Sequence, residues 1–161
     1  MPDLRQACAP LSDGQQSDAF VLFGAMGDLA HKKIFPALYN LVARGHLDVP
    51  VIGVARAGRT DEHLRQRAKD SVQQQIRHIN EAVLSKLLGL LKYVGGDYKQ
   101  QSTFHALRKA LGSAQRPAHY LAIPPELFIT VVESLAKADC LKHARVISKS
   151  LSAVISSPHK N

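Results

Sequence analysis

Short apolar runs alternate with longer amphipathic stretches along the chain, a pattern in which strands and helices follow one another. The apolar runs predict strands at residues 19–23, 49–55, 93–94, 119–123 and 144–147. The stretches between them carry apolar residues three and four positions apart and predict helices over 28–44, 60–79, 80–91, 102–111 and 126–138. Strands separated by helices favour right-handed crossovers. The sequence therefore predicts an α/β fold with a doubly wound parallel sheet that is covered on both faces.

Several residues mark the ends of these predicted helices. Thr60, Asn80 and Ser102 have side chains that cap helix N-termini, and Gly45 is placed to stop the first helix. Pro36 lies inside that first helix, where it has no N–H to donate to the preceding turn. We therefore expect the first helix to bend or restart near Pro36.

The composition is that of a folded domain with an excess of positive charge. Of 161 residues, 45% are hydrophobic and 21% charged, and the length suits one domain with a sizeable core. The net charge of +8 would suit a nucleic acid, an acidic membrane surface or a phosphorylated ligand. The basic residues are scattered along the predicted helices without a dense block, so solvated helix faces explain them as well. We expect no nucleic-acid partner.

Other sequence features exclude further classes of protein. Cys8 and Cys140 form neither a ligand spacing nor a disulfide framework, which is typical of a reducing cytoplasm, and the eight histidines show no metal-ligand cluster. All apolar runs are shorter than the roughly 18 residues that a membrane span requires. Residues 1–18 are polar, lack the apolar segment of a signal peptide and are expected to form a flexible tail. These features predict a cytoplasmic protein without a metal site or a membrane partner.

The stretch with the clearest chemical meaning is a glycine-rich turn after the first predicted strand. The apolar run 19–23 ends at Gly24, a second glycine follows at Gly27, and Asp28 begins a predicted helix. A turn of this kind presents backbone N–H groups and the positive end of a helix to an anion, and glycine lets that anion approach the backbone. The turn therefore predicts a site for a pyrophosphate.

The end of the second predicted strand indicates which dinucleotide would bind there. In an NAD site, an acidic residue about 20 residues after the glycine turn binds the ribose hydroxyl. Here the strand ends in Arg56, and a guanidinium group suits a 2′-phosphate instead. We therefore predict NADP, although a solvated arginine at a strand end remains the alternative. Lys32 and Lys33 would add positive potential or simply face water.

A proline-rich loop follows the fourth predicted strand. The segment H-Y-L-A-I-P-P, residues 119–125, ends at the carboxyl edge of the predicted sheet, where open α/β sheets bind ligands. The paired prolines stiffen the loop, and a nicotinamide ring could lie against it. A rigid turn before a helix is an equally good interpretation.

Four segments in order carry a resemblance to a known family. They are G-A-M-G-D-L-A-H-K-K-I-F-P-A-L-Y-N-L, I-G-V-A-R, Y-L-A-I-P-P-E-L-F and A-R-V-I, and they run from about Phe20 to Ile147. This pattern resembles glucose-6-phosphate dehydrogenase, whose first segment commonly reads G-A-S-G-D-L-A-K-K-K-I-Y-P. The resemblance implies a Rossmann-like NADP-binding domain over residues 19–147, without the α+β domain that follows it in the family.

The resemblance also implies which residues bind the cofactor. Arg56 would bind the 2′-phosphate, and Asp97, Tyr98 and Phe128 are positions that the family places near the cofactor. Met26 stands where the family usually has a small or polar residue. The residues implied to bind the pyrophosphate are Gly24, Ala25, Met26, Gly27, Asp28, Leu29, Ala30 and His31.

After Ile147 the sequence departs from the family pattern. The family continues V-E-K-P-F-G-x-D-L, whereas residues 148–161 are S-K-S-L-S-A-V-I-S-S-P-H-K-N. Codons for residues 148–156 can also encode E-K-P-F-G-S-D-L in the neighbouring frame. We therefore interpret this tail as out of frame after the loss of one nucleotide. The family's general base and sugar-phosphate ligands lie in a later R-I-D-H-Y-L-G-K segment that this sequence lacks, so no catalytic residue is assigned.

The resemblance implies a reaction and several partners. Family members are homo-oligomers that oxidise glucose 6-phosphate to 6-phosphogluconolactone with NADP in the oxidative pentose phosphate pathway. For this chain alone we expect weak NADP binding without turnover. A stand-alone nucleotide-binding or regulatory module that pairs with an intact subunit is the alternative. A short-chain-type reductase would need a Tyr-x-x-x-Lys pair, and none of the four tyrosines has a lysine four residues on.

Overall fold

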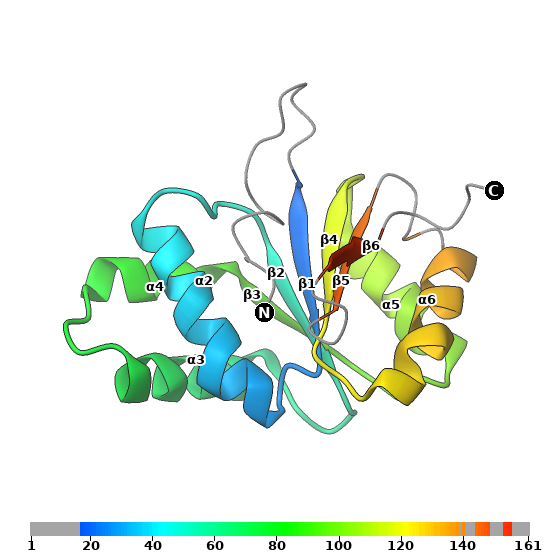
Figure 1. Cartoon of the computed structure of the whole chain (residues 1–161), viewed down its shortest axis with the longest axis horizontal. Helices are drawn as coiled ribbons and strands as arrows, with labels where there is room; N and C mark the ends of the chain where they lie inside the picture. Colours follow the sequence, from blue (N-terminus) through cyan, green and yellow to red (C-terminus); the bar gives the residue numbers. More distant parts are fainter. Residues whose placement is uncertain (1–16, 139, 141–143, 149–152, 156–161) are drawn as a thin grey trace.

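The computed structural model describes residues 17–138, 140, 144–148 and 153–155. Within these residues, six strands form one sheet in the order β3-β2-β1-β4-β5-β6 (Figure 1). The first five strands run parallel, and β6 pairs antiparallel with β5. The strands are β1 (Ala19–Phe23), β2 (Val51–Ala55), β3 (Leu91–Gly95), β4 (Pro117–Leu121), β5 (Arg145–Ser148) and β6 (Ala153–Ile155). The predicted doubly wound parallel sheet is confirmed.

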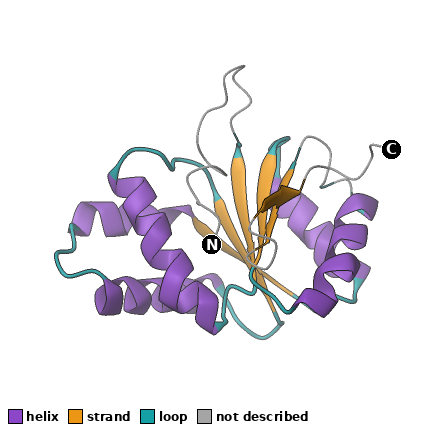
Figure 2. Cartoon of the chain, in the orientation of Figure 1, coloured by secondary structure: helices purple, strands orange, loops and turns teal. Residues whose placement is uncertain are grey.

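Helices cover both faces of the sheet, as Figure 2 shows. One face carries the π-helical segment η1 (Ala30–Ile34), α2 (Phe35–Ala43), α3 (Asp61–Gln75) and α4 (Glu81–Leu90). The other face carries α5 (Gln101–Leu111) and, after the short 3₁₀ turn η2 (Pro125–Leu127), α6 (Phe128–Lys137). Because a parallel sheet with helices on both faces is buried on both sides, the central strands consist of continuous apolar runs.

The core is divided by the sheet into two apolar clusters. On the first face, Leu38, Leu64 and Leu87 from α2, α3 and α4 pack against alternate residues of β1 and β2. On the second face, Phe104 of α5 and Val131 of α6 pack against the residues of the same strands that point the other way. All five residues of β1, of β2 and of β4 are buried. The two-sided burial fixes the strands that present the loops at the carboxyl edge.

The first helix does not break at the proline but changes its hydrogen-bonding pattern just before it, and the expected bend or restart stays a prediction. The helical stretch begins at Asp28, passes through the π-helical turn η1 and continues as α2 with Pro36 in its first turn. In a π-helical turn, the carbonyl of His31 would accept a hydrogen bond from the N–H of residue 36, but Pro36 has no N–H. The buried Ser71 hydroxyl of α3 donates to this carbonyl instead. Gly45, with a φ of 74°, ends the helix where it was expected to end.

Two of the three predicted helix caps are confirmed. The Thr60 hydroxyl accepts a hydrogen bond from the His63 N–H, and the His63 ring accepts one from the Thr60 N–H. The Asn80 side chain accepts the N–H groups of Ala82 and Val83. Ser102 is not a cap, because α5 begins one residue before it.

The cap position of α5 belongs to Gln100, whose side chain forms no capping bond. Its N–H donates to the Asp97 carbonyl in a turn, and the Thr103 hydroxyl donates to the same carbonyl. This compact turn starts the helix earlier than the serine predicted. Further boundaries also differ. The helix α3 ends at Gln75 rather than near residue 79, Leu91 begins β3 instead of ending α4, and β4 spans Pro117–Leu121 rather than 119–123.

The predicted tails lie mostly outside the described residues. The flexible tail was predicted at 1–18, of which the structure describes Ser17 and Asp18; the Asp18 carboxylate accepts the N–H groups of Gln115 and Arg116. β6 lies within the segment 148–161, which was predicted to fall outside the family pattern. The interpretation of that segment as out of frame stays a prediction.

Candidate functional site

The carboxyl ends of β1, β2 and β4 meet at one edge of the sheet, and the glycine turn lies there. Gly24 directly follows β1, and its N–H donates to the Val54 carbonyl of β2 at 3.0 Å. On the other side, the Ala122 N–H donates to the Phe23 carbonyl at 3.0 Å, which holds the start of the proline loop against the end of β1. The predicted glycine turn and proline loop are therefore neighbours.

Gly24 stands at a position where the fold leaves no room for a side chain. Its φ is 83°, a conformation that residues with a Cβ rarely adopt. A Cβ there would collide with the Ala122 carbonyl oxygen and lie 3.2 Å from Cγ2 of Ile123. Glycine at this position lets the turn pass directly beneath the proline loop.

The N-terminus of the first helix faces the same edge. The Gly27 N–H donates to the Gly24 carbonyl, and the helix's first backbone bond runs from the His31 N–H to the Gly27 carbonyl. The N–H groups of Asp28, Leu29 and Ala30 therefore precede the first intrahelical donor, the usual state of a helix N-terminus. Gly27 and Asp28 are exposed. Free N–H groups and the helix dipole make this turn an anion-binding position.

Two basic side chains lie beside the turn. Arg67 of α3 donates from Nη2 to the Gly27 carbonyl at 3.3 Å, and its buried Nε has no hydrogen-bond partner among the described residues. The His31 ring bonds through Nε2 to the Gln74 side chain at 3.1 Å, and its buried Nδ1 likewise has no described partner. Lys32 and Lys33 on the following turn are exposed. Arg67, Lys32 and Lys33 thus place positive charge beside the turn, which itself carries the carboxylate of Asp28.

The apolar residues of the turn serve to pack it. Ala25 and Ala30 are fully buried, and Met26 and Leu29 are half-buried against the first apolar cluster. A Cβ on Gly53 of β2 would lie 2.9 Å from Cβ of Ala25, so that glycine allows the turn to pack closely on the sheet. Of the eight predicted pyrophosphate residues, these four contribute packing through their side chains.

Tyr98, predicted to lie near the cofactor, is joined to the glycine turn. The Gly24 N–H donates to its hydroxyl oxygen at 2.8 Å, and the hydroxyl donates to the Val54 carbonyl at 3.0 Å. Burial raises the pKa of Tyr98 to about 12; the Gly24 hydrogen bond opposes this rise and Tyr93 adds to it, both with smaller effects, so the hydroxyl keeps its proton at neutral pH. Tyr98 therefore holds the turn between β1 and β2.

The loop after β2 presents two arginines to solvent. Arg56 and Arg59 are both exposed in residues 56–60, which we call the arginine loop. The Tyr93 hydroxyl of β3 donates to the Arg56 carbonyl. Burial raises the pKa of Tyr93, while the charges of Arg59 and Arg56 lower it, so both guanidinium groups act on this hydroxyl. Arg59 and Tyr93 were not predicted from the sequence. Arg59 could have been found, because it is a second cation only three residues after Arg56.

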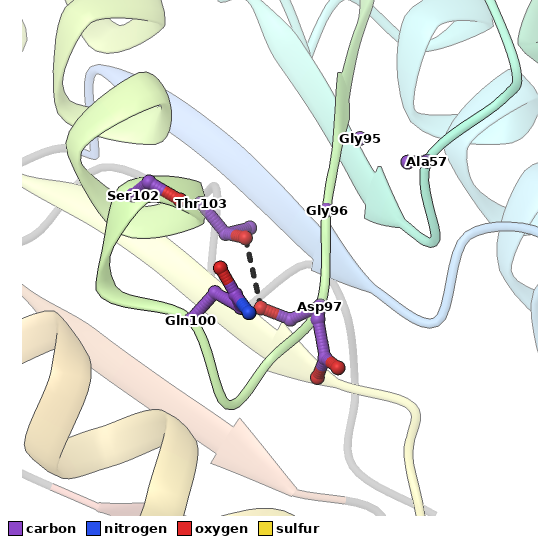
Figure 3. Close-up of a pocket in the computed structure, with 7 residues that line it drawn as sticks. All are labelled: Ala57, Gly95, Gly96, Asp97, Gln100, Ser102 and Thr103. Atoms are coloured by element: carbon purple, nitrogen blue, oxygen red, sulfur yellow. Dashed lines mark hydrogen bonds between the residues drawn. The ribbon is translucent and has the colours of Figure 1, made fainter.

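An open hollow of about 250 Å³ lies beside the arginine loop (Figure 3). Ala57 and Gly95 lie next to each other on one side of it, and the first turn of α5 lines the other side. The predicted residue Asp97 also lines the hollow, with its carboxylate accepting the Lys99 N–H at 2.8 Å. The structure therefore places Asp97 near the arginine loop rather than on the glycine turn.

Phe128 and the proline loop lie on the second face. Phe128 begins α6, and its half-buried ring packs against the second apolar cluster together with Ile123 and Tyr98. Within the described residues, Phe128 makes no polar contact with the glycine turn. Its predicted place near the cofactor stays a prediction.

His119 of β4 is a structural residue. It is fully buried, its Nε2 lies 2.9 Å from the Cys140 carbonyl, and its ring lies against Phe23. Burial lowers its pKa to about 4, opposed by the Cys140 bond and assisted by the charge of Arg108. The ring is therefore neutral at pH 7 and donates through Nε2. Because it points away from the carboxyl edge into the core, we assign it no chemistry.

Together these features define a class of protein. A sheet with its first five strands in the order 3-2-1-4-5, a glycine turn opening the first helix and a cationic loop after β2 form a Rossmann-type dinucleotide-binding domain. Comparison with known families agrees, since residues 21–157 match the family described as "Glucose-6-phosphate dehydrogenase, NAD binding domain". The chain belongs to the glucose-6-phosphate dehydrogenase family, and the resemblance of its sequence segments is confirmed.

Individual relatives support the same assignment. The chain is 41% identical over 133 residues to "Glucose-6-phosphate 1-dehydrogenase 1" of Mycobacterium bovis, covering 83% of this chain and 28% of that protein. It is 36% identical to a cytoplasmic isoform of Arabidopsis thaliana, covering 76% of this chain and 26% of the relative. The solved structure of the Mycobacterium avium enzyme superposes with a TM-score of 0.77 at 40% identity, covering 82% of this chain and 29% of that one. The chain thus spans somewhat over a quarter of the length of these relatives.

Neither a metal site nor a membrane-spanning helix is found in the described part of the chain. Among the described residues, histidine, cysteine, aspartate and glutamate side chains form no group of three that could hold a metal ion. No helix within the described part of the chain is both long and apolar enough to cross a membrane.

Proposed function

We propose that this chain is the NADP-binding domain of a glucose-6-phosphate dehydrogenase. The observation that carries the proposal is the pairing of an anion-binding glycine turn with a loop bearing two arginines at the same edge of the sheet. The family assignment supports a nicotinamide dinucleotide, and the arginine loop supports its 2′-phosphorylated form.

The residues at the glycine turn fit a pyrophosphate. Around Gly27, the N–H groups of the first helical turn and the side chain of Arg67 can donate to an anion, whereas the exposed carboxylate of Asp28 is the one acidic side chain of the turn. The buried Nε of Arg67 has no described partner and could donate a bond to an anion there. Backbone donors that need no rearrangement give the site its preorganisation.

The arginine loop fits a 2′-phosphate better than a free ribose hydroxyl. An NAD site needs a carboxylate that accepts from the 2′-hydroxyl. The first acid after Arg56 is Asp61, and its carboxylate accepts the Tyr93 N–H at 2.8 Å and lies 4.0 Å from Arg65. Because Asp61 is engaged at β3, the charged groups of the arginine loop itself are Arg56 and Arg59.

NADP, when bound, supplies the acceptor for the electrons removed from C1 of the sugar. In this chain the glycine turn would hold the pyrophosphate and the arginine loop the 2′-phosphate, while the proline loop would limit the space open to the nicotinamide. A solved relative is described as a complex "with its substrate glucose-6-phosphate", which supports the sugar phosphate as substrate of the whole enzyme. We further propose a cytoplasmic homo-oligomer, which is supported by the family and by the name of the cytoplasmic relative.

Calorimetric titration of the full chain with NADP and with NAD tests this proposal. We expect tighter binding of NADP, and we expect Arg56→Ala to weaken NADP about tenfold or more while leaving NAD unchanged. Arg59→Ala should act in the same direction with a smaller effect. Arg44→Ala is the matched control, since Arg44 is an exposed arginine at the far end of α2.

The outcomes separate the parts of the proposal. An absence of binding of either dinucleotide would overturn the assignment of the site. Equal affinity for NADP and NAD, or an Arg56→Ala variant that keeps the preference for NADP, would overturn the 2′-phosphate assignment alone.

A further inference from the structure

Tyr93 occupies a position from which it reaches the arginine loop. It lies in the middle of β3, the edge strand of the sheet next to β2, and its side chain is half-buried. Its hydroxyl donates to the backbone carbonyl of Arg56, 37 residues earlier in the sequence. This bond ties the first residue of the arginine loop to the neighbouring strand.

Tyr93 is itself fixed from two sides. Its N–H donates to the Asp61 carboxylate at 2.8 Å, which joins the strand to the first turn of α3. Its ring lies over Gly95, where a Cβ would come within 3.0 Å of Cε2 of Tyr93 and 3.2 Å of Cα of Ala57. Figure 3 shows Ala57 next to Gly95. The ring, the end of β3 and the arginine loop are therefore in close contact.

The arginine loop depends on such a tether for its order. Residues 56–60 are all exposed, and Gly58 within them has a φ of 94° with open space around it. An exposed segment that contains glycine loses considerable backbone entropy when it is held in one conformation. A fixed Arg56 carbonyl removes part of that freedom before any ligand arrives, which favours binding by preorganisation.

We propose that Tyr93 is a positioning residue for NADP selectivity, because its hydroxyl holds the arginine loop in the conformation that receives a 2′-phosphate. The inference rests on the proposed function and adds the residue that organises its specificity. The pyrophosphate position does not depend on this bond, since the glycine turn is held separately by Tyr98. Loss of the Tyr93 hydroxyl should therefore affect NADP and leave NAD unchanged.

The test is a calorimetric comparison of NADP and NAD binding by the full chain and its Tyr93→Phe variant. We expect the NADP dissociation constant to rise about three- to tenfold, the range of one lost hydrogen bond, with no change for NAD. Tyr39→Phe is the matched control. The Tyr39 hydroxyl accepts the Asn80 N–H at 2.7 Å on the side of α2 and α4, so its loss also removes one tyrosine hydrogen bond. That control should leave the ratio of the two constants unchanged.

A second variant makes the test independent of how Tyr93→Phe folds. Gly95→Ala places a methyl group between the Tyr93 ring and Ala57, and it should also lower the NADP-to-NAD preference. Equal weakening of both dinucleotides by Tyr93→Phe, or an unchanged preference in both variants, would overturn the inference. If Arg56→Ala abolishes the preference while Tyr93→Phe keeps it, the inference fails and the proposed function stands. If Arg56→Ala leaves the preference for NADP unchanged, the 2′-phosphate assignment of the proposed function fails, and the inference about Tyr93 fails with it.

Discussion

Substitution of Gly24 by alanine tests the geometry of the glycine turn most directly. Holding alanine at a φ of 83° costs about 1–2 kcal/mol. The new methyl group would also collide with the Ala122 carbonyl, a backbone atom that cannot rotate away, and overpacking of this kind costs about 1–3 kcal/mol. We therefore expect the free energy of unfolding to fall by about 2–5 kcal/mol, a large part of the stability of a domain of this size.

Gly112→Ala is the matched control for that experiment. Gly112 ends α5 with a φ of 60° and a ψ of −123°, and a Cβ there meets nothing within 4 Å, so only the conformational cost of about 1–3 kcal/mol applies. Urea unfolding followed by far-ultraviolet circular dichroism measures both variants, since the chain contains no tryptophan for fluorescence. If Gly24→Ala were no more destabilising than Gly112→Ala, the close approach of the proline loop to the turn would be refuted.

Two further predictions concern buried polar groups. Ser71→Ala should lower the free energy of unfolding by about 1–3 kcal/mol, because it leaves the His31 carbonyl without its donor. The control Ser102→Ala, at an exposed serine that does not cap α5, should change it by less than about 0.5 kcal/mol. Equal effects of the two substitutions in thermal unfolding would contradict both the π-helical turn and the corrected cap. For His119, burial holds the pKa at about 4 while the unfolded ring titrates near 6.5, so the unfolded chain takes up the proton first as the pH falls. The free energy of unfolding should therefore not change through this group above about pH 7, and it should decrease by up to about 3 kcal/mol between pH 6.5 and 4. Urea titrations at each pH measure this dependence, and His119→Gln should remove the part of it that His119 causes. An unchanged pH dependence in that variant would contradict the prediction.

The elements that sequence patterns predicted correctly are those determined by neighbouring residues. The apolar run of β1 has all its side chains buried between two helical layers, which its composition alone requires. Thr60 and Asn80 cap helices with their own side chains, and Pro36, which has no N–H, lies just after the π-helical turn. The predicted cap at Ser102 was wrong because a turn closed by Asp97 competes with it, and that turn has no distinctive sequence.

The contacts that organise the candidate site were not predictable for a related reason. The Tyr93 hydroxyl binds the Arg56 carbonyl, and the Tyr98 hydroxyl binds the Gly24 N–H. Both partners are backbone groups, which every residue possesses, so no residue type in the arginine loop or the glycine turn signals that a tyrosine will reach it. The side chains that would contact the ligand can be predicted from their chemistry. The hydrogen bonds through which Tyr93 and Tyr98 fix the two loops become visible only in the folded structure, although the family resemblance had already named Tyr98. The selectivity of the proposed site for NADP therefore depends also on residues that do not contact the ligand. Substitutions at Tyr93 should change this selectivity even though the glycine turn and Arg56 stay intact.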